Sequence, residues 1–151
     1  MKPTIYIGAD HAGFDMKALI KEHLELQGYI VDDVGAHTFD ETDDYPIYAK
    51  AVAQAVRAHP NSLGILSCGN AEGIMIAANK FDGIRAGIGY SMEAARSMRT
   101  DDNANIIAIP GRIELTDTPT AIVDQFVQTP FSQKPRHTRR LQQVHEIEKA
   151  E

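Results

Sequence analysis

The sequence predicts an α/β fold in which helices cover both faces of a parallel sheet. Short apolar or β-branched runs alternate five times with longer segments of helical composition, as in consecutive βαβ units. One run, residues 63–66 (LGIL), carries no polar side chain, which is typical of a strand buried on both faces. The chain has 151 residues, 43% of them hydrophobic, so we expect one domain over residues 1–151.

The first half of the chain predicts three strands and two helices. Residues 4–8 (TIYIG) and 63–66 are expected to be strands, and residues 29–31 (YIV) to begin another. The first helix has an apolar side made of Phe14, Ala18, Leu19, Leu24 and Leu26, and Gly28 closes it. A long acidic loop at residues 32–44 precedes a helix at 45–58, with Pro46 near its start where a missing N–H costs little.

The second half continues the alternation. A tight turn at residues 68–73 leads into a helix from Ile74 onward. Two more strands are expected, at residues 83–88 and 105–109, and three more helices, at 91–98, 116–127 and 136–149. Ser91 is the expected N-cap of the helix at 91–98.

Composition excludes several classes of protein. The net charge of -6 and a pI of about 5.5 argue against nucleic acid or an anionic membrane as partner. The N-terminus has no signal-like segment and no apolar run approaches the roughly 20 residues of a membrane helix, so we expect a cytoplasmic protein. A single cysteine and six scattered histidines without a metal-binding motif predict neither a metal nor another cofactor.

The candidate site lies where the strands are expected to end. Ligands of parallel α/β sheets bind beyond the carboxyl ends of the strands. We expect the loops that carry Asp10, His11, Asp44, Cys68 and Asp101 at this edge.

Cys68 opens the turn between the third strand and its helix. Gly69 permits backbone angles that a side chain would forbid, and the amides of residues 69–73 could hold an oxyanion or a phosphate. A helix N-terminus lowers the pKa of a thiol, so Cys68 is expected to be a reactive thiolate. The alternative is a small hydrophobic residue buried at a strand end.

Two other segments have similar alternatives. Asp10 and His11 could move a proton and bind a hydroxyl or phosphate, or they could be a helix cap and a solvated imidazole. Asp43 and Asp44 could be plain N-caps, and Tyr45 could be a core ring or a phenol offered to a ligand.

The last helix predicts an anion and a partner. Arg136 and Arg140 stand four residues apart at its N-terminal end, where positive charge opposes the helix dipole unless a phosphate lies between them. The alternative is a solvated basic patch paired with nearby acids. Leu141, Val144 and Ile147 form a thin apolar stripe that could pack on another subunit.

Five segments in this order resemble the type B ribose-5-phosphate isomerase family, which includes the allose-6-phosphate and galactose-6-phosphate isomerases. They are residues 8–14 (GADHAGF), 44–46 (DYP), 68–80 (CGNAEGIMIAANK), 83–86 (GIRA) and 103–105 (NAN). The resemblance covers almost the whole chain. It implies a three-layer α/β/α Rossmann-like sandwich, a homodimer or dimer of dimers with a site at the interface, and metal-free aldose–ketose isomerisation of a phosphorylated sugar.

The resemblance also implies a role for each site residue. Cys68 would be the base that moves a proton between C2 and C1 through a cis-enediolate, stabilised by the turn that holds Gly69, Asn70, Glu72 and Gly73. Asp10 and Tyr45 would contact sugar hydroxyls or the ring oxygen. His11, Arg136 and Arg140 would hold the phosphate, with Arg112 a further contributor.

The chain departs from the family pattern at two places. Asp101 and Asp102 stand where many members have a His that helps to open the sugar ring, followed by an Asn. A carboxylate of ordinary pKa, about 4, is a poorer acid at neutral pH than imidazole. In the turn, Asn70, Ala71 and Glu72 replace a usual Thr or Ser, a Gly, and an apolar or small polar residue, and Glu72 would raise the pKa of Cys68 if the two lie close. The chain could therefore serve another sugar phosphate, or bind one without catalysis.

Overall fold

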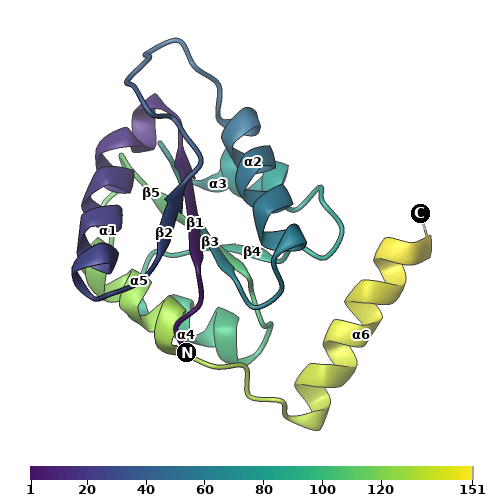
Figure 1. Ribbon diagram of the computed structural model, residues 1–151. Helices are drawn as coiled ribbons and strands as arrows, with labels where there is room; N and C mark the ends of the chain where they lie inside the picture. The colour runs from purple at the N-terminus through teal and green to yellow at the C-terminus, as the bar shows by residue number, and fades with distance from the viewer. Residues whose placement is uncertain (151) are drawn as a thin grey trace.

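The computed structural model describes residues 1–150, and within them it contains one five-stranded parallel sheet and six α-helices (Figure 1). The strands are β1 (Ile5–Ala9), β2 (Val31–Asp33), β3 (Leu63–Cys68), β4 (Ala86–Ile88) and β5 (Ile106–Pro110). The helices are α1 (Phe14–Leu26), α2 (Tyr45–Ala58), α3 (Glu72–Ala78), α4 (Met92–Thr100), α5 (Pro119–Gln128) and α6 (Pro135–Ala150), and a 3-10 turn, His11–Gly13, precedes α1.

The sheet has the order β2-β1-β3-β5-β4, which places β1, β3 and β5 at its centre. Its register aligns Ala9 with Ser67 and Cys68 with Pro110, so the three central strands end at one edge. Helices α1, α4 and α5 cover one face and α2 and α3 the other (Figure 1). The predicted three-layer α/β/α sandwich with a five-stranded parallel sheet is confirmed.

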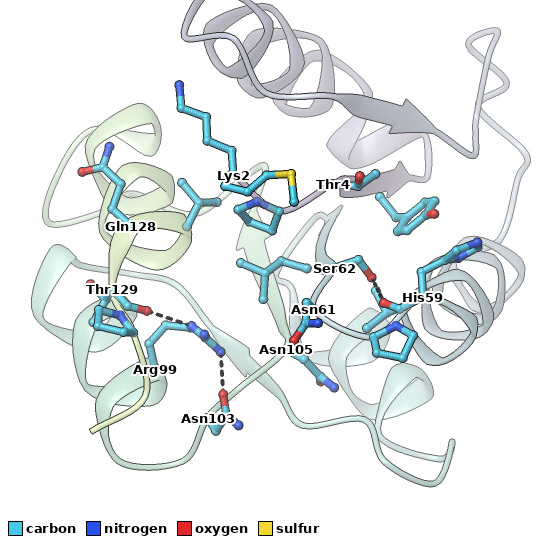
Figure 2. A pocket seen from close by; sticks show the side chains of 18 of the residues that line it. Lys2, Thr4, His59, Asn61, Ser62, Arg99, Asn103, Asn105, Gln128 and Thr129 are labelled. Carbon is cyan, nitrogen blue, oxygen red and sulfur yellow. Dashed lines mark hydrogen bonds between the residues drawn. The ribbon is translucent and has the colours of Figure 1, made fainter. Parts of the chain in front are cut away.

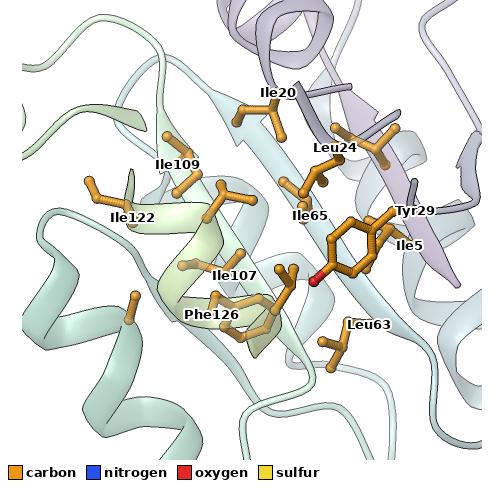
Figure 3. Close-up of a cluster of buried hydrophobic side chains, with 14 of the residues drawn as sticks. Ile5, Ile20, Leu24, Tyr29, Leu63, Ile65, Ile107, Ile109, Ile122 and Phe126 are labelled. Atoms are coloured by element: carbon orange, nitrogen blue, oxygen red, sulfur yellow. The ribbon is translucent and has the colours of Figure 1, made fainter. Parts of the chain in front are cut away.

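Two apolar layers fill the space between the sheet and its helices. Figure 3 shows the layer under α1 and α5, where isoleucines of β1, β3 and β5 pack against Leu24 and Phe126. On the other face, Val52 and Val56 of α2 pack against Leu66 and Ile106. Side chains alternate between the faces of a strand, so a buried strand needs apolar residues at successive positions, as residues 63–66 have.

Most predicted elements are present with small shifts at their ends. The helix predicted at residues 45–58 has those bounds as α2, with Pro46 in its first turn. Ser91 is the N-cap of α4, since its hydroxyl accepts from the amide of Ala94, and Gly28 follows α1 with a φ of 83°. The helix after Cys68 begins at Glu72 rather than at Ile74.

The predicted apolar side of α1 is partly wrong. Leu19 is 46% exposed and Leu26 82% exposed, whereas Ile20, Leu24 and Lys17 are buried. Lys17 is accommodated because its ammonium donates to both carboxylate oxygens of Asp33, at 2.8 and 3.0 Å, and to the carbonyl of Ala36. The ion pair joins α1 to the end of β2.

Close backbone approach brings three loops together at the carboxyl edge. A Cβ on Gly13 would lie 2.4 Å from the carbonyl of Ser67, and one on Gly111 would lie 2.3 Å from the carbonyl oxygen of Ala12. The amide of Gly111 donates to the carbonyl of Cys68, and that of Arg112 to the carbonyl of Gly69. The loops after β1, β3 and β5 therefore contact one another directly.

Helix α6 extends away from the sandwich (Figure 1). A connector leads to it from the amino edge of the sheet, where the amide of Ser132 donates to the carbonyl of Thr100. Near its other end, Glu148 accepts from the amide of Gly83. Val144 is 44% exposed and Ile147 67% exposed, so the apolar stripe of α6 is uncovered in the single chain. Among residues 1–150, no helix combines the length and apolar character needed to span a membrane.

Candidate active site

Asp10 lies at the end of β1 with its carboxylate folded back onto the chain. Oδ1 accepts from the amides of Ala12 and Gly13, at 3.0 and 3.2 Å, so Asp10 caps the 3-10 turn as the alternative interpretation expected. The residue is only 5% exposed, and this burial raises its pKa, although the amide of Gly13 and the neighbouring His11 work in the other direction. Asp10 combines a capping role with a position beside Cys68.

Cys68 ends β3 at the centre of the carboxyl edge and is 3% exposed. Burial raises the pKa of its thiol, and the nearby Asp10 carboxylate adds to this, although the amides of Ile74, Ala71 and Asn70 favour the thiolate. The expected lowering of the thiol pKa is therefore wrong, because the loss of solvation outweighs the amide dipoles. The predicted turn does wrap its amides around the sulfur.

The strained residue of this turn is Ala71 rather than Gly69. Ala71 has a φ of 70° in the left-handed region, whereas Gly69 has no positive φ. A Cβ on Gly69 would meet nothing closer than 3.6 Å, so its conformation does not require glycine. Ala71 is fully buried, and its methyl group contributes to the apolar layer under α2 and α3.

His11 is held by a carboxylate from the long loop between β2 and α2. Asp43 Oδ1 accepts from the backbone amide of His11 and lies 2.8 Å from its Nδ1, and the amide distance is also 2.8 Å. The other oxygen, Oδ2, accepts from the Tyr48 hydroxyl at 2.9 Å. The hydrogen bond between His11 and Asp43 raises the pKa of His11. Asp10 adds to this rise, whereas burial and Arg112 oppose it, each with a smaller effect. Asp43 is thus no N-cap, and His11 is not a freely solvated imidazole.

Tyr45 and Arg112 complete the group that one chain assembles. A Cβ on Gly73 would lie 2.6 Å from Tyr45 Cζ, so the phenol lies over the first turn of α3 and remains 37% exposed. Arg112 follows β5, packs beside Gly69 and lies near enough to His11 to oppose its positive charge. Asn70 Oδ1 is 3.9 Å from the Cys68 sulfur, and Glu72 is exposed at the start of α3.

Four predicted site residues do not lie at the carboxyl edge of the sheet. Asp101 and Asp102 stand in the turn between α4 and β5, before a parallel strand, so they occupy the amino edge opposite Cys68. The expectation that Asp101 lies at the carboxyl edge is wrong, because its loop enters a strand rather than leaving one. Arg136 and Arg140 begin α6, which starts at the same amino edge. Asp101 instead lies 3.7 Å from Nε2 of the buried His137.

A cavity of about 710 Å³ also opens at the amino edge (Figure 2). Its lining includes Lys2, Arg85 and Arg99 but no carboxylate. Arg99 donates to the carbonyl of Thr129 and to Asn103 Oδ1, and Arg85 donates to the carbonyl of Asn103, so both guanidinium groups fix the surrounding turns. None of the predicted site residues lines this cavity.

The side chains of Asp10, His11 and Asp43 form a candidate metal cluster, since one ligand atom of each lies within 4.8 Å of the others. Their hydrogen bonds give a different explanation. Asp43 uses one oxygen on His11 and the other on Tyr48, and Asp10 accepts from two amides. No buried side-chain polar atom in residues 1–150 lacks a hydrogen-bond partner, so the cluster contains no buried, unpaired ligand atom.

Sequence reasoning missed Asp43 and Tyr48 as part of the site. The contact of Asp43 with His11 spans 32 residues, and Tyr48, which bonds to Asp43, lies on α2 one turn beyond Tyr45. The available signal was the run of three titratable or phenolic residues at 43–45 next to a loop that was already expected to be functional.

Comparisons with known proteins agree with the fold and identify a family. The family model for Ribose/Galactose Isomerase matches residues 5–144. Ribose-5-phosphate isomerase B of Mycolicibacterium paratuberculosis is 44% identical over 145 residues, which cover 96% of this chain and 91% of that protein. The galactose-6-phosphate isomerase subunit LacB of Clostridium acetobutylicum is 38% identical, over 85% of this chain and 73% of that one.

Solved structures give the same result. A crystal structure of ribose-5-phosphate isomerase B from Mycoplasma genitalium with bound ribulose-5-phosphate has a TM-score of 0.92 and 37% identity, covering 99% of this chain and 98% of the other. Ribose-5-phosphate isomerase B from Clostridium thermocellum has a TM-score of 0.92 at 39% identity, covering 97% of this chain and 98% of the other.

Proposed function

Because the chain belongs to the Ribose/Galactose Isomerase family, we propose that it interconverts ribose 5-phosphate and ribulose 5-phosphate, with Cys68 as the base. The observation that carries this proposal is full-length similarity to ribose-5-phosphate isomerase B, one structure of which holds ribulose-5-phosphate. The location of Cys68 supports its role, because the sulfur ends a central strand and is surrounded by backbone amides.

The proton transfer balances without an oxidant or a metal. The Cys68 thiolate takes the proton from C2 of the open-chain aldose, and the C–H electron pair forms the C1=C2 bond of a cis-enediolate while the C1 carbonyl oxygen becomes an oxyanion. The amides of the turn after Cys68 stabilise that oxyanion. The proton of the C2 hydroxyl passes to the C1 oxygen, which moves the negative charge to the C2 oxygen. The thiol then returns its proton to C1 as the C2 carbonyl forms, and the Cys68 thiolate is regenerated.

We assign the phosphate to two groups of cations. His11 and Arg112 lie together at the carboxyl edge and would bind it from one chain. Arg136 and Arg140 begin a helix at the opposite edge, so they reach a phosphate only from a second copy, as a homodimer or dimer of dimers provides. Asp101 and Asp102 would enter the site from the same copy, with Asp101 in place of a ring-opening imidazole.

The test is turnover of a panel of five- and six-carbon aldose phosphates in D2O, followed by NMR. We expect conversion of ribose 5-phosphate to ribulose 5-phosphate with deuterium incorporated at the exchanging carbon, unaffected by EDTA. Conversion of allose 6-phosphate or galactose 6-phosphate alone would select another member of the same family. Binding of every sugar phosphate without exchange would replace the enzyme with a sugar-phosphate-binding protein.

Asp101 and Asp102 favour one alternative within the family, the isomerisation of allose 6-phosphate or galactose 6-phosphate. If Asp101 opens a furanose ring poorly, a substrate with more open-chain form should be turned over faster. A ribose 5-phosphate kcat/KM equal to or above those of the hexose phosphates removes the reason for this alternative.

A further inference from the structure

We infer that Asp43 is a positioning residue for His11: it holds the imidazole in one orientation and one tautomer, leaving Nε2 as the ring nitrogen available to a ligand phosphate. The inference deepens the proposed function, because it rests on His11 as a phosphate ligand. The sequence had offered Asp43 only as a helix cap.

The contact fixes His11 at two points. One oxygen of Asp43 accepts from the backbone amide of His11 and lies against ring atom Nδ1, and both distances are 2.8 Å. Rotation about the bonds of the His11 side chain would break the second contact while the first holds the backbone. The Asp43 side chain is 6% exposed and that of His11 24%, so water competes poorly for the carboxylate and reaches the imidazole.

The carboxylate itself is held by a third element. Tyr48 of α2 donates its hydroxyl to the second oxygen of Asp43 at 2.9 Å. A chain of Tyr48, Asp43 and His11 therefore joins α2, the loop before it and the turn after β1. Although burial works against the charged form, the amide and ring of His11 and the Tyr48 hydroxyl lower the pKa of Asp43, so it acts only as an acceptor.

An acceptor at Nδ1 determines the tautomer. Nδ1 must carry a hydrogen, so the neutral ring presents a lone pair at Nε2 and the protonated ring presents an N–H. A phosphate oxygen is an acceptor, so while Asp43 holds the hydrogen on Nδ1, Nε2 can donate to it only when the ring is protonated. The charges that face His11 are Asp43 and Asp40 on the loop, Asp10 on its own turn and Arg112 after β5, and the hydrogen bond to Asp43 is the largest cause of the raised pKa.

The decisive comparison removes one negative charge at either of two places in the same loop. Asp43→Asn keeps the shape of the side chain but removes its charge. Asp40→Asn is the matched control, because the Asp40 side chain hydrogen-bonds only to Thr42 and acts on His11 through space alone. Each variant is titrated by NMR of the imidazole nitrogens, and inorganic phosphate and ribose 5-phosphate are the ligands.

We expect Asp43→Asn to lower the pKa of His11 and to populate the Nε2–H tautomer. It should weaken inorganic phosphate binding and raise the KM for ribose 5-phosphate by about tenfold at pH 7.5, with kcat changed less than about twofold. The rise of KM with pH should begin at lower pH than in the wild type. Asp40→Asn should match the wild type in tautomer and KM, and Tyr48→Phe should give a smaller change in the same direction as Asp43→Asn.

Two results would overturn the inference. One is an unchanged His11 tautomer and pKa in a folded Asp43→Asn protein. The other, which needs no variant, is an Nε2–H tautomer in the wild type above the His11 pKa. Both readouts are independent of turnover, so an inactive protein with the expected tautomer would contradict the isomerase proposal alone.

Discussion

Cys68 combines two opposing influences in one residue. Its sulfur is surrounded by amides that favour the thiolate, yet burial and the Asp10 carboxylate raise the pKa of the thiol. The thiolate is therefore less favoured here than at an exposed cysteine. Proton abstraction by Cys68 therefore depends on a thiolate that forms at high pH or on substrate binding.

The first prediction concerns the pH dependence of turnover. Because the thiolate is the active form and burial raises the pKa of the thiol, kcat/KM should rise with pH through the alkaline range. Asp10→Asn should shift this rise to lower pH, since it removes a negative charge that disfavours the thiolate. The measurement is kcat/KM from pH 6 to 10.5. A profile that is flat above neutral pH would exclude Cys68 as the titrating base.

A second prediction separates chemistry from binding. Cys68→Ala should lower kcat by at least about a thousandfold while its affinity for ribose 5-phosphate changes by less than about threefold, because the sulfur is assigned only to proton transfer. Arg140→Ala should raise KM and leave kcat within about threefold. Steady-state kinetics and ligand titration give these values, and equal losses in the same constant would contradict the division of roles.

Residue types at strand ends were readable from the sequence, but their partners were not. Cys68, Asp10 and His11 were expected at the carboxyl edge because each follows a recognisable strand. Asp43 was missed because its contact with His11 crosses 32 residues of chain. The direction of the Cys68 pKa shift was wrong because a sequence motif indicates nearby amides but not the depth of burial.

At the scale of elements, the site depends on loops that meet without intervening side chains. Gly13 and Gly111 allow the turn after β1 to lie against the loops after β3 and β5. Predicting that a helix exists was easier than predicting which of its side chains are buried. Helix α2 was located at its observed bounds, whereas two exposed leucines of α1 were assigned to the core and the buried Lys17 was not. Lys17 is buried because it pairs with Asp33 in the folded structure, and the hydrophobic periodicity of the sequence cannot predict such a pair.

A third prediction tests this loop packing. Gly111→Ala would place a Cβ 2.3 Å from the carbonyl oxygen of Ala12, so the loops must separate, and we expect a loss of about 2 to 4 kcal/mol in unfolding free energy. Gly69→Ala is the control, since its Cβ would meet only ordinary contacts at 3.6 Å and should cost less than about 1 kcal/mol. Urea unfolding measures both, and equal stability of the two variants would refute the packing argument.

A fourth prediction concerns the Lys17–Asp33 pair in acid. Burial opposes the charged form of Asp33, but the ammonium of Lys17 and the amide of Gly35 lower its pKa below the ordinary value. A carboxylate with a lowered folded-state pKa stabilises the fold above its unfolded pKa, and this contribution is lost as the pH falls through the folded pKa. Asp33→Asn should cost about 3 kcal/mol at pH 7, because Lys17 is left buried without its carboxylate, and less at pH 3.

The control for this pair is Lys17→Met combined with Asp33→Asn. The double variant removes the buried charge as well as its partner, so it should regain much of the stability lost in Asp33→Asn. Urea unfolding at pH 3, 5 and 7 compares the three proteins. The same stability difference at each pH would mean that the contribution of Asp33 is not electrostatic.

At the scale of the whole molecule, the predicted site residues fall into two groups at opposite edges of the sheet. The carboxyl edge holds Cys68, Asp10, His11, Tyr45 and Arg112, and the amino edge holds Asp101, Asp102, Arg136 and Arg140. The sequence order of motifs could not reveal this separation, since strand order and the path of the last helix are tertiary properties. A site composed from two copies reconciles the groups.

The fifth prediction follows from this composition. Cys68→Ala and Arg140→Ala proteins, each of low activity alone at limiting substrate, should regain activity when they are mixed, unfolded and refolded together. Random pairing gives one intact site in half of the dimers, or about a quarter of the wild-type kcat/KM. Separately refolded and then briefly mixed proteins are the control. No gain over the two variants assayed apart would place both residues in a site within one chain.

The position of α6 outside the two helical layers has a consequence for how the protein works in dilute solution. If this helix completes a neighbour's site, an isolated chain lacks two of the four cations proposed for the phosphate, and its own apolar stripe stays in water. Specific activity should then fall when the protein is diluted below its self-association constant and recover on concentration. The turnover rate per chain would thus depend on the concentration of the protein as well as on that of the sugar phosphate.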